Sequence, residues 1–152
     1  MVLFLKGLIA FSVIGLATEC CFNGVRDQIN RKLRGESVDW QLPCRTWIWS
    51  VLVFGLSAAI NFPLLLALYP EIFAWHWLVR GTFYLLGIYA CEFFWGWLLE
   101  TLLGKCPWEY EASPYRVWRY LRPRFAPLWF LYGFVLEWTQ LRLMPLLDQL
   151  GT

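Results

Sequence analysis

The stretch Thr46–Tyr69, TWIWSVLVFGLSAAINFPLLLALY, decides the fold of this chain because it contains no charged residue. About 20 apolar residues in a row are enough for an α-helix to cross the hydrocarbon core of a bilayer. A helix that is apolar all round must be buried, and a chain of 152 residues is too small to bury it in a soluble domain. The stretch therefore predicts a transmembrane helix.

Three further segments, at about residues 2–22, 77–103 and 126–144, have the same apolar character. Pro127 suits the first turn of the last one, and Pro145 is expected to end it. The chain as a whole is 59% hydrophobic and 16% charged, whereas soluble domains carry about 25% charged residues. We therefore expect an all-α integral membrane protein with four transmembrane helices, forming a single domain over residues 1–152.

Two polar connections, residues 23–45 and 104–125, separate these helices. Each carries five Lys and Arg residues, whereas the turn between the second and third helices carries none. Loops rich in Lys and Arg stay on the cytoplasmic side of a membrane. The count therefore predicts that both basic loops are cytoplasmic and that both termini lie on the opposite side.

The second basic loop contains a finer pattern between residues 113 and 125. Basic residues recur every three positions, and a stripe of aromatic and apolar residues follows the same spacing beside them. On a helix this arrangement is typical of a segment that lies in the membrane interface against anionic headgroups. An ordinary basic loop that only satisfies topology is an equally good interpretation. The predicted headgroup-binding residues are Arg116, Arg119, Arg122 and Trp118.

Acidic residues inside the predicted helices are the candidate polar site, and they are Glu19, Glu92, Glu100 and Glu137. A carboxylate at membrane depth costs several kcal/mol unless it is paired, hydrogen-bonded or protonated. One interpretation makes the four acids a site for a small cation, a proton or a lipid headgroup. The favoured one makes them polar contacts that hold neighbouring helices together. Glu100 is expected to pair with Arg119 or Arg122. Arg80 lies near the opposite end of its helix, where a long side chain can extend toward the membrane surface.

The sequence contains no motif for catalysis, metal binding or phosphate binding by a glycine-rich loop. The five cysteines form no C-x-x-C pair and accompany a single histidine, so they are expected to be small buried apolar residues. His76 is expected to be a polar residue at the membrane interface. We therefore predict no metal, no cofactor, no enzymatic activity and no nucleic-acid partner.

The first and second halves of the chain follow the same layout. Each has a helix with a glutamate, Glu19 or Glu92, followed by a second acid eight positions later, a basic loop, a proline and another apolar segment. If this is a repeat, its halves are parallel and related by an axis along the membrane normal.

The block Glu92–Glu100, EFFWGWLLE, followed by Cys106–Tyr110, CPWEY, resembles a signature of the transmembrane protein 229 family. That family is similar to bacterial proteins described as type IV permeases of ABC transporters. Gly15 and Glu19 on the first helix agree with it as well. Relatives have a Y-N-x-x-G step after this block, but Asn and Gly are missing after Tyr115. The resemblance implies a helical membrane fold and no particular cargo.

Two functions remain open. The favoured one is a structural or accessory subunit of a larger membrane assembly, with lipids and other membrane subunits, or a second copy, as partners. The alternative is a permease-like transport protein that uses the intramembrane carboxylates. Carboxylates that face a water-filled cavity would favour transport, whereas carboxylates that face arginines or neighbouring helices would favour the structural role.

Overall fold

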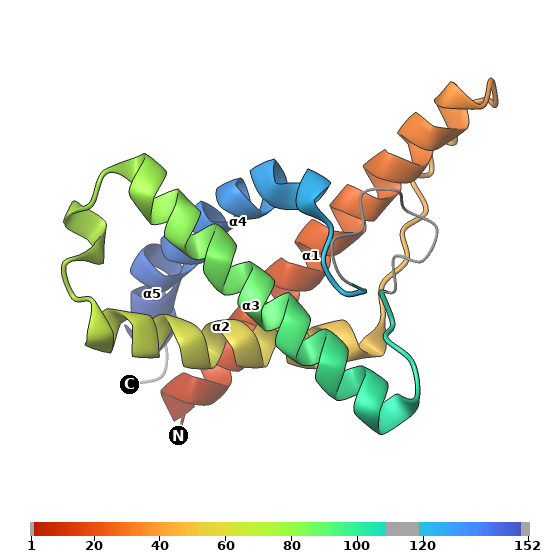
Figure 1. The fold of residues 1–152 in the computed structure, drawn as a ribbon. Coiled ribbons are helices and arrows are strands. Elements are labelled where there is room, and N and C mark those ends of the chain that lie inside the picture. The colour runs from red at the N-terminus through yellow and green to blue at the C-terminus, as the bar shows by residue number, and fades with distance from the viewer. Residues whose placement is uncertain (1, 109–118, 150–152) are drawn as a thin grey trace. The chain divides into compact units, whose positions relative to one another are not determined.

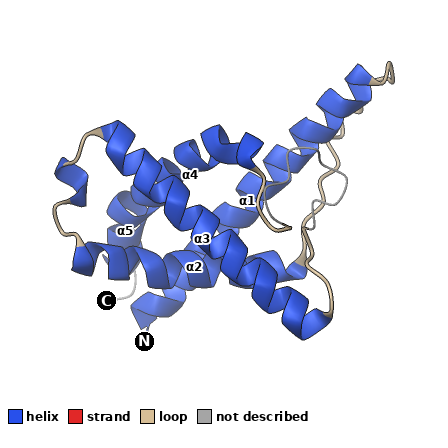
Figure 2. Cartoon of the chain, in the orientation of Figure 1, coloured by secondary structure: helices blue, strands red, loops and turns tan. Residues whose placement is uncertain are grey.

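A computed structural model describes residues 2–108 and 119–149, which form helices and no strand (Figures 1 and 2). The all-helical fold predicted from the sequence is confirmed. Three helices are long and apolar enough to cross a membrane. They are α1 (Val2–Leu33), α2 (Ile48–Leu68) and α3 (Trp77–Leu103).

Helix α1 is longer than predicted, because it continues from Phe22 to Leu33. The prediction took the first polar residues as the end of the helix. Polar side chains end the apolar stretch, but they do not interrupt the helical backbone. The segment has no proline, so nothing in it interrupts the backbone hydrogen bonds. The helix ends where Gly35 adopts φ 76°, a left-handed conformation that costs glycine little.

Helices α2 and α3 have the bounds that the sequence predicts, to within two residues. At the start of α3, His76 accepts a hydrogen bond from the amide of Leu78 at 3.4 Å, so this residue caps the helix. At its end, Gly104 has φ 79° and its amide bonds to the carbonyl of Glu100. The same left-handed glycine stop therefore ends α1 and α3.

The predicted fourth helix is divided in the structure. Helix α4 (Ala126–Trp138) continues as a π-helical turn, Thr139–Leu143, and then as α5 (Met144–Gln149). The expectation that Pro145 ends the helix is wrong, since α5 includes it. A proline ring inside an α-helix clashes with the carbonyl four residues earlier. Here that carbonyl belongs to Leu141, inside the widened π turn, which gives the ring room.

The chain forms two compact units, Met1–Ile60 and Asn61–Thr152, and each is described by itself. In the first unit, the side chain of Phe54 lies against Gly15, and Ser12 donates a 2.7 Å hydrogen bond to the carbonyl of Val51. These contacts join α1 to the first part of α2. Small residues at such positions allow helices to approach closely.

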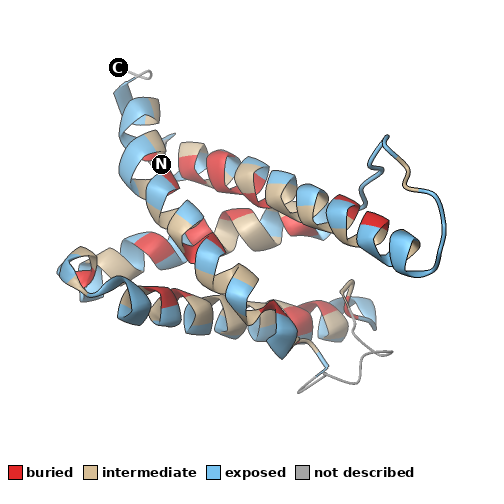
Figure 3. Cartoon of the chain, turned by 90° about the horizontal axis from the view of Figure 1, so that it is seen from above, coloured by how far each residue is buried: buried red, intermediate tan, exposed pale blue. Residues whose placement is uncertain are grey.

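In the second unit, glycines on α3 and α4 receive aromatic side chains from the other helix. Phe130 lies against Gly81, and Tyr84 lies against Gly133. Tyr84 also belongs to a buried cluster with Phe62 and Ile72. Buried residues lie among exposed and half-buried ones along the helices (Figure 3).

Candidate functional site: carboxylates along the helices

Glu137 on α4 has the most complete set of partners. Its Oε2 lies 2.9 Å from Nε of Arg80 and accepts a 2.7 Å hydrogen bond from the hydroxyl of Tyr84, both on α3. The side chains of Arg80 and Glu137 are 17% and 13% exposed, so the ion pair is largely protected from its surroundings. Such a buried pair is costly to break, because either partner alone would be an uncompensated charge.

Arg80 also contacts two other residues of this unit. Its Nη1 donates to the carbonyl of Phe73 at 2.8 Å, and its guanidinium lies 5.5 Å from the centre of the Phe134 ring. Arg80 therefore has partners on α4 and in the turn before α3. The hydrogen bond to the carbonyl of Phe73 and the ion pair with Glu137 together compensate the buried guanidinium.

Glu100, near the end of α3, is bound by two consecutive residues of the second basic loop. Arg119 forms an ion pair with one carboxylate oxygen, and the hydroxyl of Tyr120 donates to the other. The predicted pairing of Glu100 with Arg119 is thus confirmed. The hydrogen bond to the carboxylate, together with burial and the negative charge, raises the pKa of Tyr120 above its ordinary value.

Glu19 on α1 accepts a 2.5 Å hydrogen bond from the hydroxyl of Thr46, just before α2. Both residues belong to the first unit. Three of the four predicted acids therefore have a hydrogen-bond donor from a neighbouring segment of their own unit. Within the second unit, Glu100 and Glu137 have different partners.

A glycine lies four residues before each of these three acids, at Gly15, Gly96 and Gly133. Each of these glycines carries an aromatic ring from another segment, namely Phe54, Tyr120 and Tyr84 in that order. Residues four apart share one face of a helix. The glycine makes room for the ring. The segment that carries the ring therefore lies close to the helix, within reach of the glutamate one turn later.

This G-x-x-x-E spacing is the signal that the sequence interpretation missed. The ring of Tyr120 fills the space that Gly96 leaves on α3. In two of the three cases the ring itself belongs to the tyrosine that donates to the acid. The sequence contains both features, but the partner tyrosines lie far from the acids along the chain.

Glu92 is the exception. Position 88, four residues before it, is an isoleucine. The Oε2 atom of Glu92 is buried, and the indole of Trp129 on α4 lies near this carboxylate. Within the described part of the chain, neither Glu92 Oε2 nor Trp129 Nε1 has a hydrogen bond of ordinary geometry.

Of the four predicted headgroup-binding residues, the structure describes two. Arg116 and Trp118 lie outside the described residues. Arg119 is bound to Glu100, and the guanidinium of Arg122 lies 5.1 Å from the centre of the Phe125 ring. The two described arginines thus have contacts within the second unit.

The cysteines are free thiols, and they differ in exposure. Cys106 is buried, but Cys21 and Cys44 are exposed, so the expectation of five buried cysteines is wrong for these two. Among residues 2–108 and 119–149, no three His, Cys, Asp or Glu side chains are grouped to hold a metal ion.

No protein-family model matches the chain, and no solved structure matches it significantly.

Proposed function

We propose that this protein is a structural or accessory subunit of a larger membrane assembly, in which the intramembrane carboxylates hold the protein's own helices together. The observation that supports this proposal is the environment of Glu137. Its partners, Arg80 and Tyr84, come from the neighbouring helix and leave its charge compensated. A carboxylate that binds a transported cation must exchange partners, and an ion pair this protected resists exchange.

The other paired acids support the same interpretation. Glu19 and Glu100 each accept a hydrogen bond from a residue next to another helix or in the following loop. In lipid, where the hydrophobic effect does not bring helices together, such contacts and small residues provide the association energy. The G-x-x-x-E spacing places a small residue and a polar side chain on the same face of one helix.

Glu92 supports the alternative, a permease-like transport function. A buried carboxylate oxygen with no hydrogen bond in the described residues is the kind of group that a proton or a small cation could occupy. This alternative depends on one acid, whereas the structural role accounts for three.

The proposal includes a membrane topology with four spans. Helices α1, α2 and α3 are the candidates by length and composition. The fourth span would run through α4, the π turn and α5, which follow one another without a gap in 13, five and six residues. Together they exceed the roughly 20 residues that a span needs. The positive-inside rule then places both basic loops in the cytoplasm and both termini outside.

The parallel repeat and the resemblance to the transmembrane protein 229 family remain part of this proposal. The block that carries the resemblance contains Gly96 and Glu100, one of the three glycine–glutamate pairs. Its physical role in this chain is to seat Tyr120 beside Glu100.

The test compares assembly and flux. Native gel electrophoresis after mild detergent extraction from the source membrane should show the protein in a complex larger than the purified chain. The purified chain in proteoliposomes should show no proton or cation flux above protein-free vesicles. Glu92→Gln should change neither result, because the amide keeps the shape and hydrogen-bonding capacity of the side chain.

The opposite pattern would favour transport. Flux by the purified wild-type chain that disappears in a folded Glu92→Gln protein would reject the structural role.

A further inference from the structure

The first basic loop folds back beside the end of α1 and forms with it an open polar cavity within the first unit. The cavity has a volume of about 360 Å³. This lies near the lower end of the range of small-ligand sites, about 300–1,000 Å³. Its polar lining consists of Asp27, Gln28, Asn30, Arg31, Arg34 and Arg45. The lining residues thus include three arginines and one aspartate, which makes the cavity basic.

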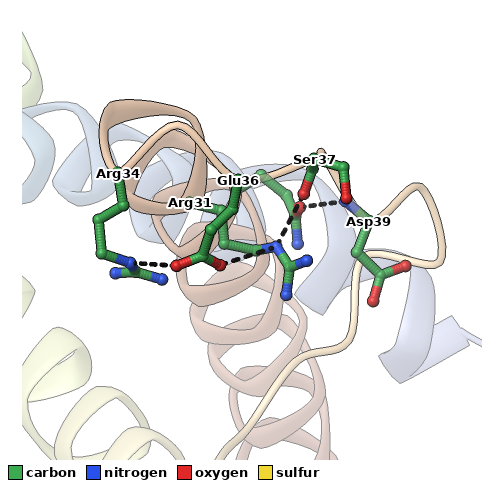
Figure 4. Close-up of polar contacts among 6 residues, drawn as sticks. Arg31, Arg34, Glu36, Ser37 and Asp39 are labelled. Atoms are coloured by element: carbon green, nitrogen blue, oxygen red, sulfur yellow. Dashed lines mark hydrogen bonds and ion pairs between the residues drawn. The ribbon is translucent and has the colours of Figure 1, made fainter.

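Gly35 creates this arrangement. Its positive φ reverses the chain, so that the amide of Glu36 bonds to the carbonyl of Arg31 at 3.0 Å. The same reversal brings the carboxylate of Glu36 between two arginines of α1. It lies 2.6 Å from Nε of Arg34 and 3.8 Å from Nε of Arg31 (Figure 4). A carboxylate of the protein thus already occupies an anion position on these two arginines.

Two further hydrogen bonds hold the loop in place. Arg31 donates to the carbonyl of Ser37 at 3.0 Å, and Gln28 accepts from the amide of Asp39 at 2.7 Å (Figure 4). These contacts hold Arg31 and the backbone of the loop in place before any ligand binds. Such preorganisation lowers the entropic cost of binding.

Arg45, the third arginine of the lining, differs from Arg31 and Arg34 in its contacts. Within the described part of the chain, its guanidinium forms no ion pair and no hydrogen bond. Asp27, the acid in the lining, is already 3.3 Å from Arg26 and so does not neutralise Arg45. A guanidinium offers a planar fork of donors that matches the oxygens of a phosphate.

We propose that this cavity binds a phosphate group, with Arg45 as the free guanidinium and with Glu36 as an internal competitor that the phosphate displaces from Arg31 and Arg34. The phosphate belongs either to a phospholipid headgroup or to a soluble phosphoester. Arg45 precedes Ile48, the first residue of the apolar helix α2, by three residues, which places it where headgroups lie. The lipid source rests on the membrane insertion proposed above, and the soluble source does not.

The experiment uses the full-length purified protein and two probes. Native mass spectrometry measures retention of phosphatidic acid after extraction from phosphatidylcholine bilayers that contain it. Calorimetry in detergent measures binding of inorganic phosphate. Arg45→Gln should weaken binding about tenfold, since it removes one charge-assisted hydrogen bond. Glu36→Gln should strengthen binding, because the competitor loses its charge.

Each variant has a matched control. Lys32→Gln removes one positive charge from the same end of α1 without touching the lining. Glu71→Gln removes one negative charge in the second unit. Both controls should bind like the wild type, which separates a specific site from an effect of net charge.

The outcomes divide clearly. Weaker binding by Arg45→Gln and stronger binding by Glu36→Gln support the site, and the probe that shows this identifies the source. Equal binding of both probes by the wild type, Arg45→Gln and Lys32→Gln would overturn it. Since a gain in affinity does not arise from unfolding, Glu36→Gln tests the site even if Arg45→Gln is unstable. A protein that binds inorganic phosphate but does not insert into bilayers would reject the membrane proposal and retain this one.

Discussion

The hydroxyl of Tyr84 donates a 2.7 Å hydrogen bond to Glu137 from a ring that lies against Gly133, one helical turn before that acid. The missing Cβ of the glycine and the position of the carboxylate are therefore two parts of one contact. Tyr120 repeats the arrangement on α3, with its ring on Gly96 and its hydroxyl on Glu100.

A methyl group at Gly96 should destabilise the protein. A Cβ there would lie 2.6 to 2.8 Å from Tyr120 atoms close to the backbone, which have little freedom to move. We expect Gly96→Ala to cost about 1–3 kcal/mol, as overpacking usually does. Gly87→Ala on the same helix is the control, since nothing lies within 4 Å of its Cβ position. That variant should be neutral or up to about 1 kcal/mol more stable.

Unfolding in mixed micelles with increasing sodium dodecyl sulfate measures both variants. Equal stability of Gly96→Ala and Gly87→Ala would contradict the role assigned to the Tyr120 ring.

Removal of one hydroxyl group tests the Tyr84–Glu137 contact. Tyr84→Phe keeps the ring on Gly133 but deletes the donor to the acid, and should lower the free energy of unfolding by about 1 kcal/mol. Tyr69→Phe is the control, because Tyr69 is exposed and its hydroxyl has no hydrogen bond within residues 2–108 and 119–149. The same unfolding assay applies. A larger effect at position 69 than at position 84 would be evidence against the contact.

The Arg80–Glu137 ion pair should behave as a coupled unit. Glu137→Leu leaves the buried guanidinium of Arg80 without its carboxylate, and should cost about 3–5 kcal/mol. The double variant, with Arg80→Leu added, should recover much of this loss, since no charge then remains unpaired. Glu92→Leu should cost less than Glu137→Leu, because it leaves no buried cation behind.

A double-mutant cycle on the unfolding free energies measures this coupling. Strictly additive effects of the two single changes would show that the ion pair does not stabilise the fold.

The end of α1 should loosen in acid. The hydrogen bond from Arg34, with the charges of Arg34 and Arg31, holds the pKa of Glu36 below its ordinary value. A carboxyl group with a lowered pKa stabilises the folded state above its unfolded pKa, and this stabilisation is lost as the pH falls through the folded pKa. Amide exchange at Gly35 and Glu36, corrected for intrinsic rates, should therefore accelerate below about pH 4.

Glu36→Gln is the control for this measurement, because an amide does not titrate. Its exchange at these two amides should show no step in the same pH range. A step of equal size in both proteins would assign the titration to another group.

The proposed sidedness has a direct test with native thiols. Cys106 is buried, so Cys44, which is exposed in the first basic loop, is the suitable reporter. In sealed vesicles, an impermeant maleimide should label Cys44 only from the cytoplasmic side. A cysteine added at the C-terminus of a variant lacking both exposed thiols, Cys21 and Cys44, should be labelled only from the opposite side. Labelling of both from one side would exclude four spans.

The sequence was sufficient for the three long helices because hydropathy is a local property. Nothing charged interrupts Ile48–Leu68, so its character follows from composition alone. The ends were harder to predict. Helix α1 passes through its polar residues and ends only at Gly35, and the last helix includes Pro145 by widening a turn.

The partners of the acids were decided by tertiary structure. The partner of Glu100 could be predicted from the sequence, because Arg119 follows in the next loop and opposite charge suggested the pair. Tyr84 and Glu137 are separated by 53 positions, and no local pattern connects them. Their contact exists because Gly133 lets α3 and α4 approach closely enough for a phenol to reach a carboxylate. Local sequence thus determined which segments are helical, whereas close packing between distant segments decided which charges are compensated.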